Sequence, residues 1–193
     1  MTKLSDLVIS KVRVKLLEVF YEHPEEMYYI RELTRLIKEE INAVRRELIR
    51  LSSIGLVKEE KRANRIYYTI NRNYLFYKEL LAIIGKTTGL GKMLLKEQAR
   101  LGHLKFIMIS GRYVRHMPRK KDTVDLLIVG EVILPALADF IKNCEAKLGR
   151  DINYTVMTEA ELAYRKTHND PFINTILQGS RVMILGDEED LVA

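Results

Sequence analysis

The sequence predicts a two-domain α+β protein: three helices and a β-hairpin, then a C-terminal α/β part with a mixed sheet. Apolar residues recur at helical spacing over residues 11–54 and alternate with period two over residues 56–70. From Leu104 onward, short apolar runs alternate with helical patterns, which is typical of helices packed on a sheet. The length of 193 residues suits one or two globular domains.

The first two helices are short. Ser10 can N-cap a helix over roughly Lys11 to Tyr21, which Pro24 ends. After an extended Tyr28-Tyr29, apolar residues at helical spacing predict a second helix over residues 30–37. A polar connection, Lys38 to Glu40, then leads into a third helix.

The third helix has two unlike faces and stops at Gly55, a residue suited to a left-handed cap. Its buried stripe is expected to hold Ile41, Val44, Leu48 and Leu51. The opposite face presents Asn42, Arg45, Arg46, Ile49 and Arg50, with the acidic Glu47 flanked by arginines. Two alternating runs, Leu56 to Glu60 and Ile66 to Ile70, then flank a polar tip of residues 61–65 and predict a β-hairpin.

Three helices followed by a hairpin is the layout of a winged helix-turn-helix, here assigned to residues 1–73. The segments YYIRELTRLI, INAVRRELIRLSSIGLV and RIYYTINRNYLFYKEL also resemble the arsenical-resistance-repressor type of winged helix. The resemblance covers Ser10 to about Leu81 and implies a DNA-binding domain. Since His23, His103, His116 and His168 lack metal-ligand spacing with each other or with Cys144, we expect no metal sensor and no cofactor.

The candidate DNA-binding residues follow from where a recognition helix and a wing meet the duplex. An α-helix fits the major groove, where Arg binds guanine and Asn binds adenine. Its N-terminal part points at base edges, which favours Asn42, Arg45 and Arg46 for reading and leaves Arg50 nearer the backbone. The expected wing contacts to phosphates or a minor groove are Lys61, Arg62, Asn64 and Arg65.

Residues 74–102 are expected to form a helical linker. Tyr74 to Gly85 is expected to be one helix, and a second carries Leu90, Met93, Leu94 and Leu101. Helices after the wing often join the subunits of dimeric winged-helix proteins, and a two-fold dimer would match a palindromic site. We therefore expect a homodimer on double-stranded DNA.

The C-terminal domain, residues 103–193, is predicted from alternating strands and helices. Strands are expected over residues 104–110, 124–129, 152–157 and 182–185, with a polar loop over residues 111–123. Helices are expected from Leu134 to a stop at Gly149, and over residues 159–166 and 171–178. The acidic segment Asp187 to Asp190 is expected to be a solubilising end.

The stretch ISGRYVRHMPRKKDTVDLLIVGEV resembles the strand-turn-strand signature of the minimal nucleotidyltransferase fold. In active members, a Gly-Ser turn holds a phosphate and two carboxylates spaced i, i+2 hold Mg²⁺ for phosphoryl transfer. Here the turn reads Gly111-Arg112 after Ser110, and only Asp125 remains of the carboxylate pair. Asp122 lies one position too early to share a strand face with it.

These departures predict a degenerate, non-catalytic domain with no metal site; Asp125 would bind metal only if the domain were active. The surrounding charges, Arg112, Arg115, Arg119, Lys120 and Lys121, repel a metal ion and attract a phosphate. The candidate phosphate-binding residues are therefore Ser110, Gly111, Arg112 and Arg115. The domain could bind a nucleotide through its phosphate or take a protein ligand. Its loop could also touch DNA or simply be solvated.

The segment LGRDINYTVMTEAELAYRKTHNDPFINTILQGSRVMILGD resembles the C-terminal half of prokaryotic transcriptional regulators that fuse a winged helix to a nucleotidyltransferase-like domain. This resemblance implies a sequence-specific regulator whose second domain is a sensor or an interaction module. Two alternatives stay open. One is an active nucleotidyltransferase of the antitoxin or antibiotic-modifying kind, and the other is a protein-interaction module.

Charge, cysteine content and hydropathy agree with this assignment. The formal net charge of +6 is unevenly distributed, with +4 over residues 1–75, +8 over residues 76–122 and −6 over residues 123–193. Such a bipolar chain suggests a polyanion partner for one half. A single cysteine excludes an intramolecular disulfide, and no apolar run approaches the ~20 residues of a membrane span. Because Leu7 to Ile9 is too short for a signal peptide, we expect a cytoplasmic protein.

Overall fold

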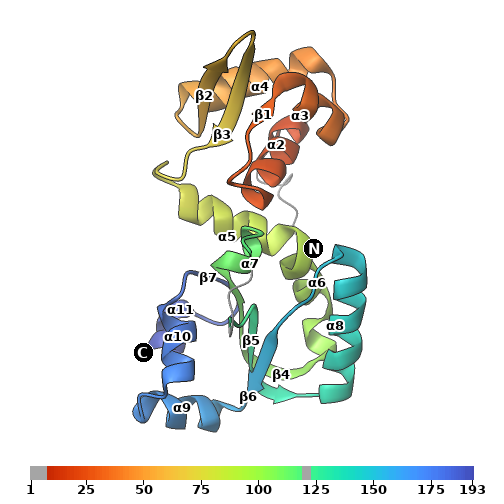
Figure 1. The fold of residues 1–193 in the computed structure, drawn as a ribbon. Coiled ribbons are helices and arrows are strands. Elements are labelled where there is room, and N and C mark those ends of the chain that lie inside the picture. The colour runs from red at the N-terminus through yellow and green to blue at the C-terminus, as the bar shows by residue number, and fades with distance from the viewer. Residues whose placement is uncertain (1–7, 119–122) are drawn as a thin grey trace. The chain divides into compact units, whose positions relative to one another are not determined.

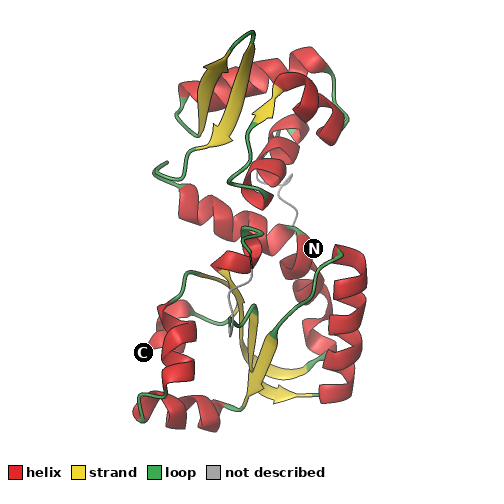
Figure 2. Ribbon diagram, viewed as in Figure 1, coloured by secondary structure: helices red, strands yellow, loops and turns green. Residues whose placement is uncertain are grey.

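The computed structural model describes residues 8–118 and 123–193 and has a mixed α+β fold (Figures 1 and 2). The chain divides into two compact units, the first ending at Ile84 and the second beginning at Gly85. This division falls inside helix α5 (Tyr77–Thr87), and so within the segment expected to be a linker. Among the described residues, no helix is both long and apolar enough to cross a membrane.

The first unit contains the helices and the hairpin expected from the sequence. Before α5, its elements are α2 (Lys11–Glu22), β1 (Tyr28–Tyr29), α3 (Ile30–Ile37), α4 (Ile41–Ser53), β2 (Val57–Arg62) and β3 (Arg65–Ile70). Ser10 caps α2 as expected, because its side chain accepts a hydrogen bond from the Arg13 backbone N–H. Gly55, with φ of 76°, follows α4 in the left-handed conformation that a glycine adopts without strain.

Three helices bury their apolar stripes against one another and form the core of the first unit. Leu16 and Phe20 of α2, Leu33 of α3 and Val44 and Leu48 of α4 are fully buried. Ile41, expected in the same stripe, is only half-buried because it is the first residue of α4. The helical period alone therefore identified most of this core.

The three strands of the first unit form an antiparallel sheet in the order β1-β3-β2. The hairpin is tighter than expected, because pairing continues to Arg62 and Arg65 and leaves a two-residue turn. Ala63 in this turn has a positive φ of 49°, as two-residue hairpin turns require. The tip expected over residues 61–65 is thus mostly strand.

Helix α5 begins at Tyr77 rather than at Tyr74. The preceding residues form turns instead: the Asn71 side chain accepts from the Asn73 N–H, and the Asn71 carbonyl accepts from the Tyr74 N–H. Asn side chains favour such turns because they satisfy backbone donors two residues ahead. The helical period over residues 74–76 did not reveal this local competition.

The second unit alternates helices and strands. After α5, its elements are α6 (Gly89–Glu97), a 3₁₀ turn (Gln98–Arg100), β4 (Gly102–Ser110), α7 (Gly111–Val114), β5 (Leu126–Val132), α8 (Leu134–Leu148), β6 (Tyr154–Met157), α9 (Glu159–Thr167), α10 (Pro171–Gln178), β7 (Arg181–Leu185) and α11 (Glu188–Val192). The expected strands and helices are present, with ends shifted by up to three residues. The helix expected to reach Leu101 ends at Glu97 and continues as the 3₁₀ turn.

The sheet of the second unit is mixed, with strand order β6-β5-β4-β7. Strand β4 pairs antiparallel with both β5 and β7, whereas β5 pairs parallel with β6 through the crossover helix α8. One face packs Phe106, Met108 and Leu127 against Leu162 of α9 and Ile173 of α10. Helices α6 and α8 lie on the other face of the sheet (Figure 1).

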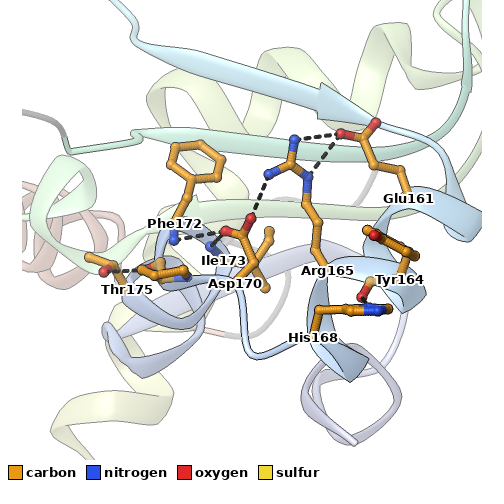
Figure 3. Close-up of polar contacts among 9 residues, drawn as sticks. Glu161, Tyr164, Arg165, His168, Asp170, Phe172, Ile173 and Thr175 are labelled. Atoms are coloured by element: carbon orange, nitrogen blue, oxygen red, sulfur yellow. Dashed lines mark hydrogen bonds and ion pairs between the residues drawn. The ribbon is translucent and has the colours of Figure 1, made fainter.

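The corner between α9 and α10 is held by one aspartate (Figure 3). Asp170 caps α10 by accepting hydrogen bonds from the backbone N–H groups of Phe172 and Ile173. Arg165 of α9 bridges Asp170 and Glu161, with nitrogen–oxygen distances of 2.9 and 2.8 Å. These contacts fix α10 over the sheet, where Ile173 is fully buried.

Two segments of the second unit differ from expectation. The loop expected after Ser110 begins with the short helix α7, which the Ser110 side chain caps. The acidic end is helix α11 rather than only a solubilising tail, because Leu191 is fully buried in the core beside β4 and β5. Burial of one leucine side chain is worth roughly 2 kcal/mol, which favours ordering this segment.

Candidate nucleic-acid interface

The exposed side of α4 carries a stripe of three polar residues and one isoleucine at helical spacing. Asn42, Arg45, Arg46 and Ile49 stand at positions i, i+3, i+4 and i+7, and all four are exposed. Val44, Leu48 and Leu51 bury the other side of the helix. We call these four exposed residues the α4 stripe; the predicted base-reading residues Asn42, Arg45 and Arg46 are thus brought together on one surface.

Glu47 does not lie on that surface, which corrects the expectation that it stands among exposed arginines. Its side chain is only 7% exposed and accepts hydrogen bonds from Ser10 Oγ at 3.0 Å and Arg13 Nε at 2.9 Å. Burial raises the pKa of this carboxyl, but the hydrogen bonds and the charges of Arg13 and Arg50 outweigh it and hold the pKa below its ordinary value. Glu47 therefore stays charged and fastens α4 to the start of α2.

The same carboxylate also binds Arg50, with Nη1 3.1 Å from Glu47 Oε1. Arg50 remains 64% exposed and is paired with Glu47, whose carboxylate also binds Arg13 of α2. In contrast, Arg46 forms no hydrogen bond or ion pair with any described residue, and Arg45 makes only a long 3.4 Å contact to Asn42. Arg45 and Arg46 thus have donors to offer a ligand.

The N-terminus of α4 is already capped from within the chain. Glu40 accepts a hydrogen bond from the Ala43 backbone N–H at 2.9 Å. Hydrogen bonds from the backbones of Asn42 and Ala43 lower the pKa of this carboxyl. The helix end itself therefore offers little to an anion, and the recognition capacity of α4 lies in its side chains.

The hairpin beside α4 has two faces of different composition. Cross-strand pairing places Lys61 with Ile66 on one face and Arg62 with Arg65 on the other. Because faces alternate along a strand, the face with Arg62 and Arg65 also holds Tyr67 and its β1 partner Tyr29. The four predicted wing residues therefore separate into the paired arginines, Lys61 on the opposite face, and Asn64 in the turn.

Both hairpin arginines lie over tyrosine rings. The Arg65 guanidinium is 4.8 Å from the Tyr29 ring centroid, and that of Arg62 is 5.9 Å from the Tyr67 centroid. The two rings meet edge to face at 5.9 Å. Arg62 also pairs with Glu60 at 2.7 Å, but both side chains are more than half exposed, so this ion pair contributes little.

In the second unit, the polar groups of the predicted phosphate-binding turn form hydrogen bonds within the protein. Ser110 Oγ accepts from the Tyr113 N–H, and the Gly111 N–H donates to the Ser180 carbonyl at 2.7 Å. A Cβ on Gly111 would lie 2.4 Å from Ser180 Oγ, so the glycine permits this close packing. The hydroxyl and the amide expected to hold a phosphate both have intramolecular partners.

The two predicted arginines of this turn also contact the protein. Arg112 donates to the Pro118 carbonyl at 2.8 Å, and Arg115 donates to Ser180 Oγ at 2.9 Å. The basic residues expected beside them, Arg119, Lys120 and Lys121, lie outside the described residues, as does Asp122.

Asp125 is buried, with 5% of its surface exposed, immediately before β5. Its Oδ2 accepts a hydrogen bond from the Asn153 N–H at 3.0 Å, while Asn153 Nδ2 donates to the Thr123 carbonyl. Over residues 8–118 and 123–193, no three His, Cys, Asp or Glu side chains are grouped so that they could hold a metal ion. A single buried carboxylate does not fit the Mg²⁺ site that the nucleotidyltransferase resemblance implies.

Comparison with known proteins adds no further guide to function. No protein-family model matches the chain, and no curated protein or solved structure matches it. The geometry of the α4 stripe and the hairpin is therefore the main guide to function.

Proposed function

We propose that the protein is a sequence-specific DNA-binding regulator of transcription whose first unit is a winged helix-turn-helix. The observation that carries this proposal is the α4 stripe, where Asn42, Arg45 and Arg46 are exposed on a helix with an opposite side buried in the core. We further propose that it works in the cytoplasm, where it would meet double-stranded DNA.

The chemistry of the α4 stripe supports major-groove reading. The groove is about 12 Å wide and admits an α-helix, and its base edges pair with Arg at guanine and with Asn at adenine. Glu47, the acidic residue nearest Arg45 and Arg46 in sequence, is buried and hydrogen-bonded to Ser10 and Arg13, so its carboxylate does not face phosphates on the exposed side. Arg50 is paired with Glu47, and we expect it to contact the DNA backbone rather than a base edge.

The hairpin supports contacts that position the protein without reading sequence. Lys61, Arg62, Asn64 and Arg65 are all exposed around its tip. Phosphate contacts from such side chains fix the register of a protein on the duplex but carry no sequence information. Strand β2 contacts α4, so both elements can meet one duplex.

The decisive experiment measures binding of duplexes selected from a random library, by fluorescence anisotropy at several salt concentrations. We expect one preferred sequence, and we expect Arg46→Ala to weaken its binding by about 1–3 kcal/mol and relax the preference at one base pair. Arg100→Ala, which removes an equal charge from the other unit, is the matched control and should leave binding unchanged. Equal affinity for all duplexes would refute sequence-specific binding.

We also propose that the second unit is a degenerate nucleotidyltransferase-like domain that serves as a sensor or interaction module without catalysis. The support is the intramolecular use of its key groups: Ser110 caps α7, Gly111 bonds to Ser180, and Asp125 accepts from the Asn153 amide. Within residues 8–118 and 123–193, none of these groups belongs to a cluster of three or more His, Cys, Asp or Glu side chains that could hold a metal ion.

The test of this second proposal is a transfer assay with α-labelled ATP and Mg²⁺ or Mn²⁺. We expect no label on the protein itself. Transfer that Asp125→Ala abolishes, with the fold retained by circular dichroism, would establish an enzyme and overturn the proposal.

The regulator is proposed to act as a homodimer. Two large apolar side chains before α5 are exposed, Leu75 at 80% and Phe76 at 53%, which is consistent with an additional contact surface. A two-fold dimer would bind a palindromic site. Sedimentation of the free protein should give twice the chain mass, and Leu75→Ser should reduce it.

A further inference from the structure

Ile49 is the one apolar member of the α4 stripe. Its surface is 56% exposed, although isoleucine is among the residue types most often buried. It follows Arg46 by three positions and Arg45 by four, so all three side chains project from the same side of the helix.

Exposure alone would carry no inference, because single apolar residues are common on protein surfaces. What distinguishes Ile49 is its place among side chains that can hydrogen-bond to base edges. It also lies on a helix whose rotation about its own axis is fixed by packing. Val44 and Leu48 are fully buried on the other side of α4, and Glu47 is fastened to Ser10 and Arg13. The Ile49 side chain is therefore held outward.

We propose that Ile49 is a specificity-determining residue that packs against the 5-methyl group of a thymine in the major groove. This inference rests on the proposed DNA binding. Thymine is the only standard base that presents a methyl group in the major groove, and apolar side chains recognise it by contact. Removing one methyl group from such a contact is expected to weaken binding by about four-fold.

The position of the thymine follows from the helix. One helical turn separates Ile49 from Arg45 and Arg46 and advances about 5.4 Å along the axis. Base pairs are spaced by about 3.4 Å. The recognised thymine is therefore expected about one or two base pairs from the pair that Arg45 or Arg46 contacts.

The test removes the methyl group from the DNA and the side chain from the protein in turn. In the preferred duplex, each thymine is replaced singly by deoxyuridine, which lacks only the methyl group, and dissociation constants are measured by anisotropy. We expect one replacement to weaken duplex binding by the wild-type protein about four-fold. The same replacement should leave the affinity of the Ile49→Ala protein unchanged.

Ile54→Ala is the matched control, because Ile54 is 57% exposed and lies just beyond the end of α4. The Ile54→Ala protein should still bind about four-fold more weakly when the same thymine is replaced by deoxyuridine. The inference is overturned if no thymine in the preferred duplex shows a cost, or if Ile49→Ala shows the same cost as the wild-type protein. If no duplex is preferred at all, the proposed sequence-specific DNA binding fails. That outcome is distinct from one in which a duplex is preferred but Ile49 makes no contact with a thymine methyl group.

Discussion

The α4 stripe of the first unit and the Ser110–Arg115 turn of the second unit are both rich in basic residues, but they use their polar groups differently. Arg46 makes no hydrogen bond or ion pair within the described chain, and Arg45 makes only a long one. In the turn, Ser110, Gly111, Arg112 and Arg115 each have a partner in the protein.

If the α4 stripe binds DNA as proposed, this difference means that net positive charge along the sequence is a weak guide to that site. The segment with the strongest basic excess, residues 76–122, contains the turn whose groups are already hydrogen-bonded. The milder excess of residues 1–75 holds the stripe whose donors are exposed. Unused hydrogen-bonding capacity, rather than net charge, distinguishes a surface available to a ligand from one engaged in folding.

The largest effect is expected for Gly111→Ala, which tests whether the Ser110–Arg115 turn is packed against the protein. The added Cβ would lie 2.4 Å from Ser180 Oγ and 3.0 Å from the Ser180 carbonyl oxygen. Overpacking of this kind should lower the free energy of unfolding by about 1–3 kcal/mol, measured by chemical denaturation, while DNA affinity stays unchanged.

Gly179→Ala is its control, because the new Cβ would meet no atom closer than 3.4 Å. A Gly111→Ala protein as stable as the wild type would show that the turn is open rather than packed. The contrast between the two regions would then be wrong.

A smaller effect is expected for Glu47→Gln. The charged carboxylate holds Ser10 and Arg13, so the substitution should cost about 1–2 kcal/mol of unfolding free energy near neutral pH. Because the pKa of Glu47 is lowered in the folded protein, its contribution is present above the ordinary pKa of 4.5 and is lost as the pH falls through the lower folded value.

Denaturation curves of both proteins over a range of pH measure this directly. The stability gap between the wild type and Glu47→Gln should close as the medium becomes more acidic than pH 4.5. A gap that is constant with pH would mean that the carboxylate charge is not what fastens α4.

The smallest effect is expected for Arg62→Ala at the hairpin. Loss of one phosphate contact should weaken all duplexes alike and reduce the slope of log affinity against log salt by about one. Lys142→Ala on α8 removes an equal charge from an exposed position of the other unit and should leave the slope unchanged. A change of base preference in Arg62→Ala would instead place Arg62 among the reading residues.

Much of the fold could be predicted because its signals are local. The apolar periods, the Ser10 cap, and the stops at Gly55 and Gly149 located the helices within a few residues. The α4 stripe could also be predicted, since the burial of Val44, Leu48 and Leu51 determines which side faces outward.

The errors arose where partners lie far apart in the sequence. Glu47 is buried because Ser10 and Arg13, more than thirty residues earlier, supply its hydrogen bonds. Likewise, Gly111 is packed against Ser180, and Leu191 is buried beside strands formed long before it in the chain. No helical or strand period records such pairings, although a lone acid between arginines in a helix, as at Glu47, is a signal that could have prompted a search for them.

The tyrosine rings beneath the hairpin arginines have a consequence for conformational entropy. A free arginine side chain loses up to about 2 kcal/mol of rotamer freedom when it is fixed against a partner. Arg65, which lies over Tyr29, has lost part of that freedom during folding, whereas no ring of the described residues lies beneath the Lys61 ammonium group. An anion that binds Arg65 would therefore contact a guanidinium that is already partly ordered. Less side-chain conformational entropy would then be lost on binding, because part of that loss has already occurred during folding.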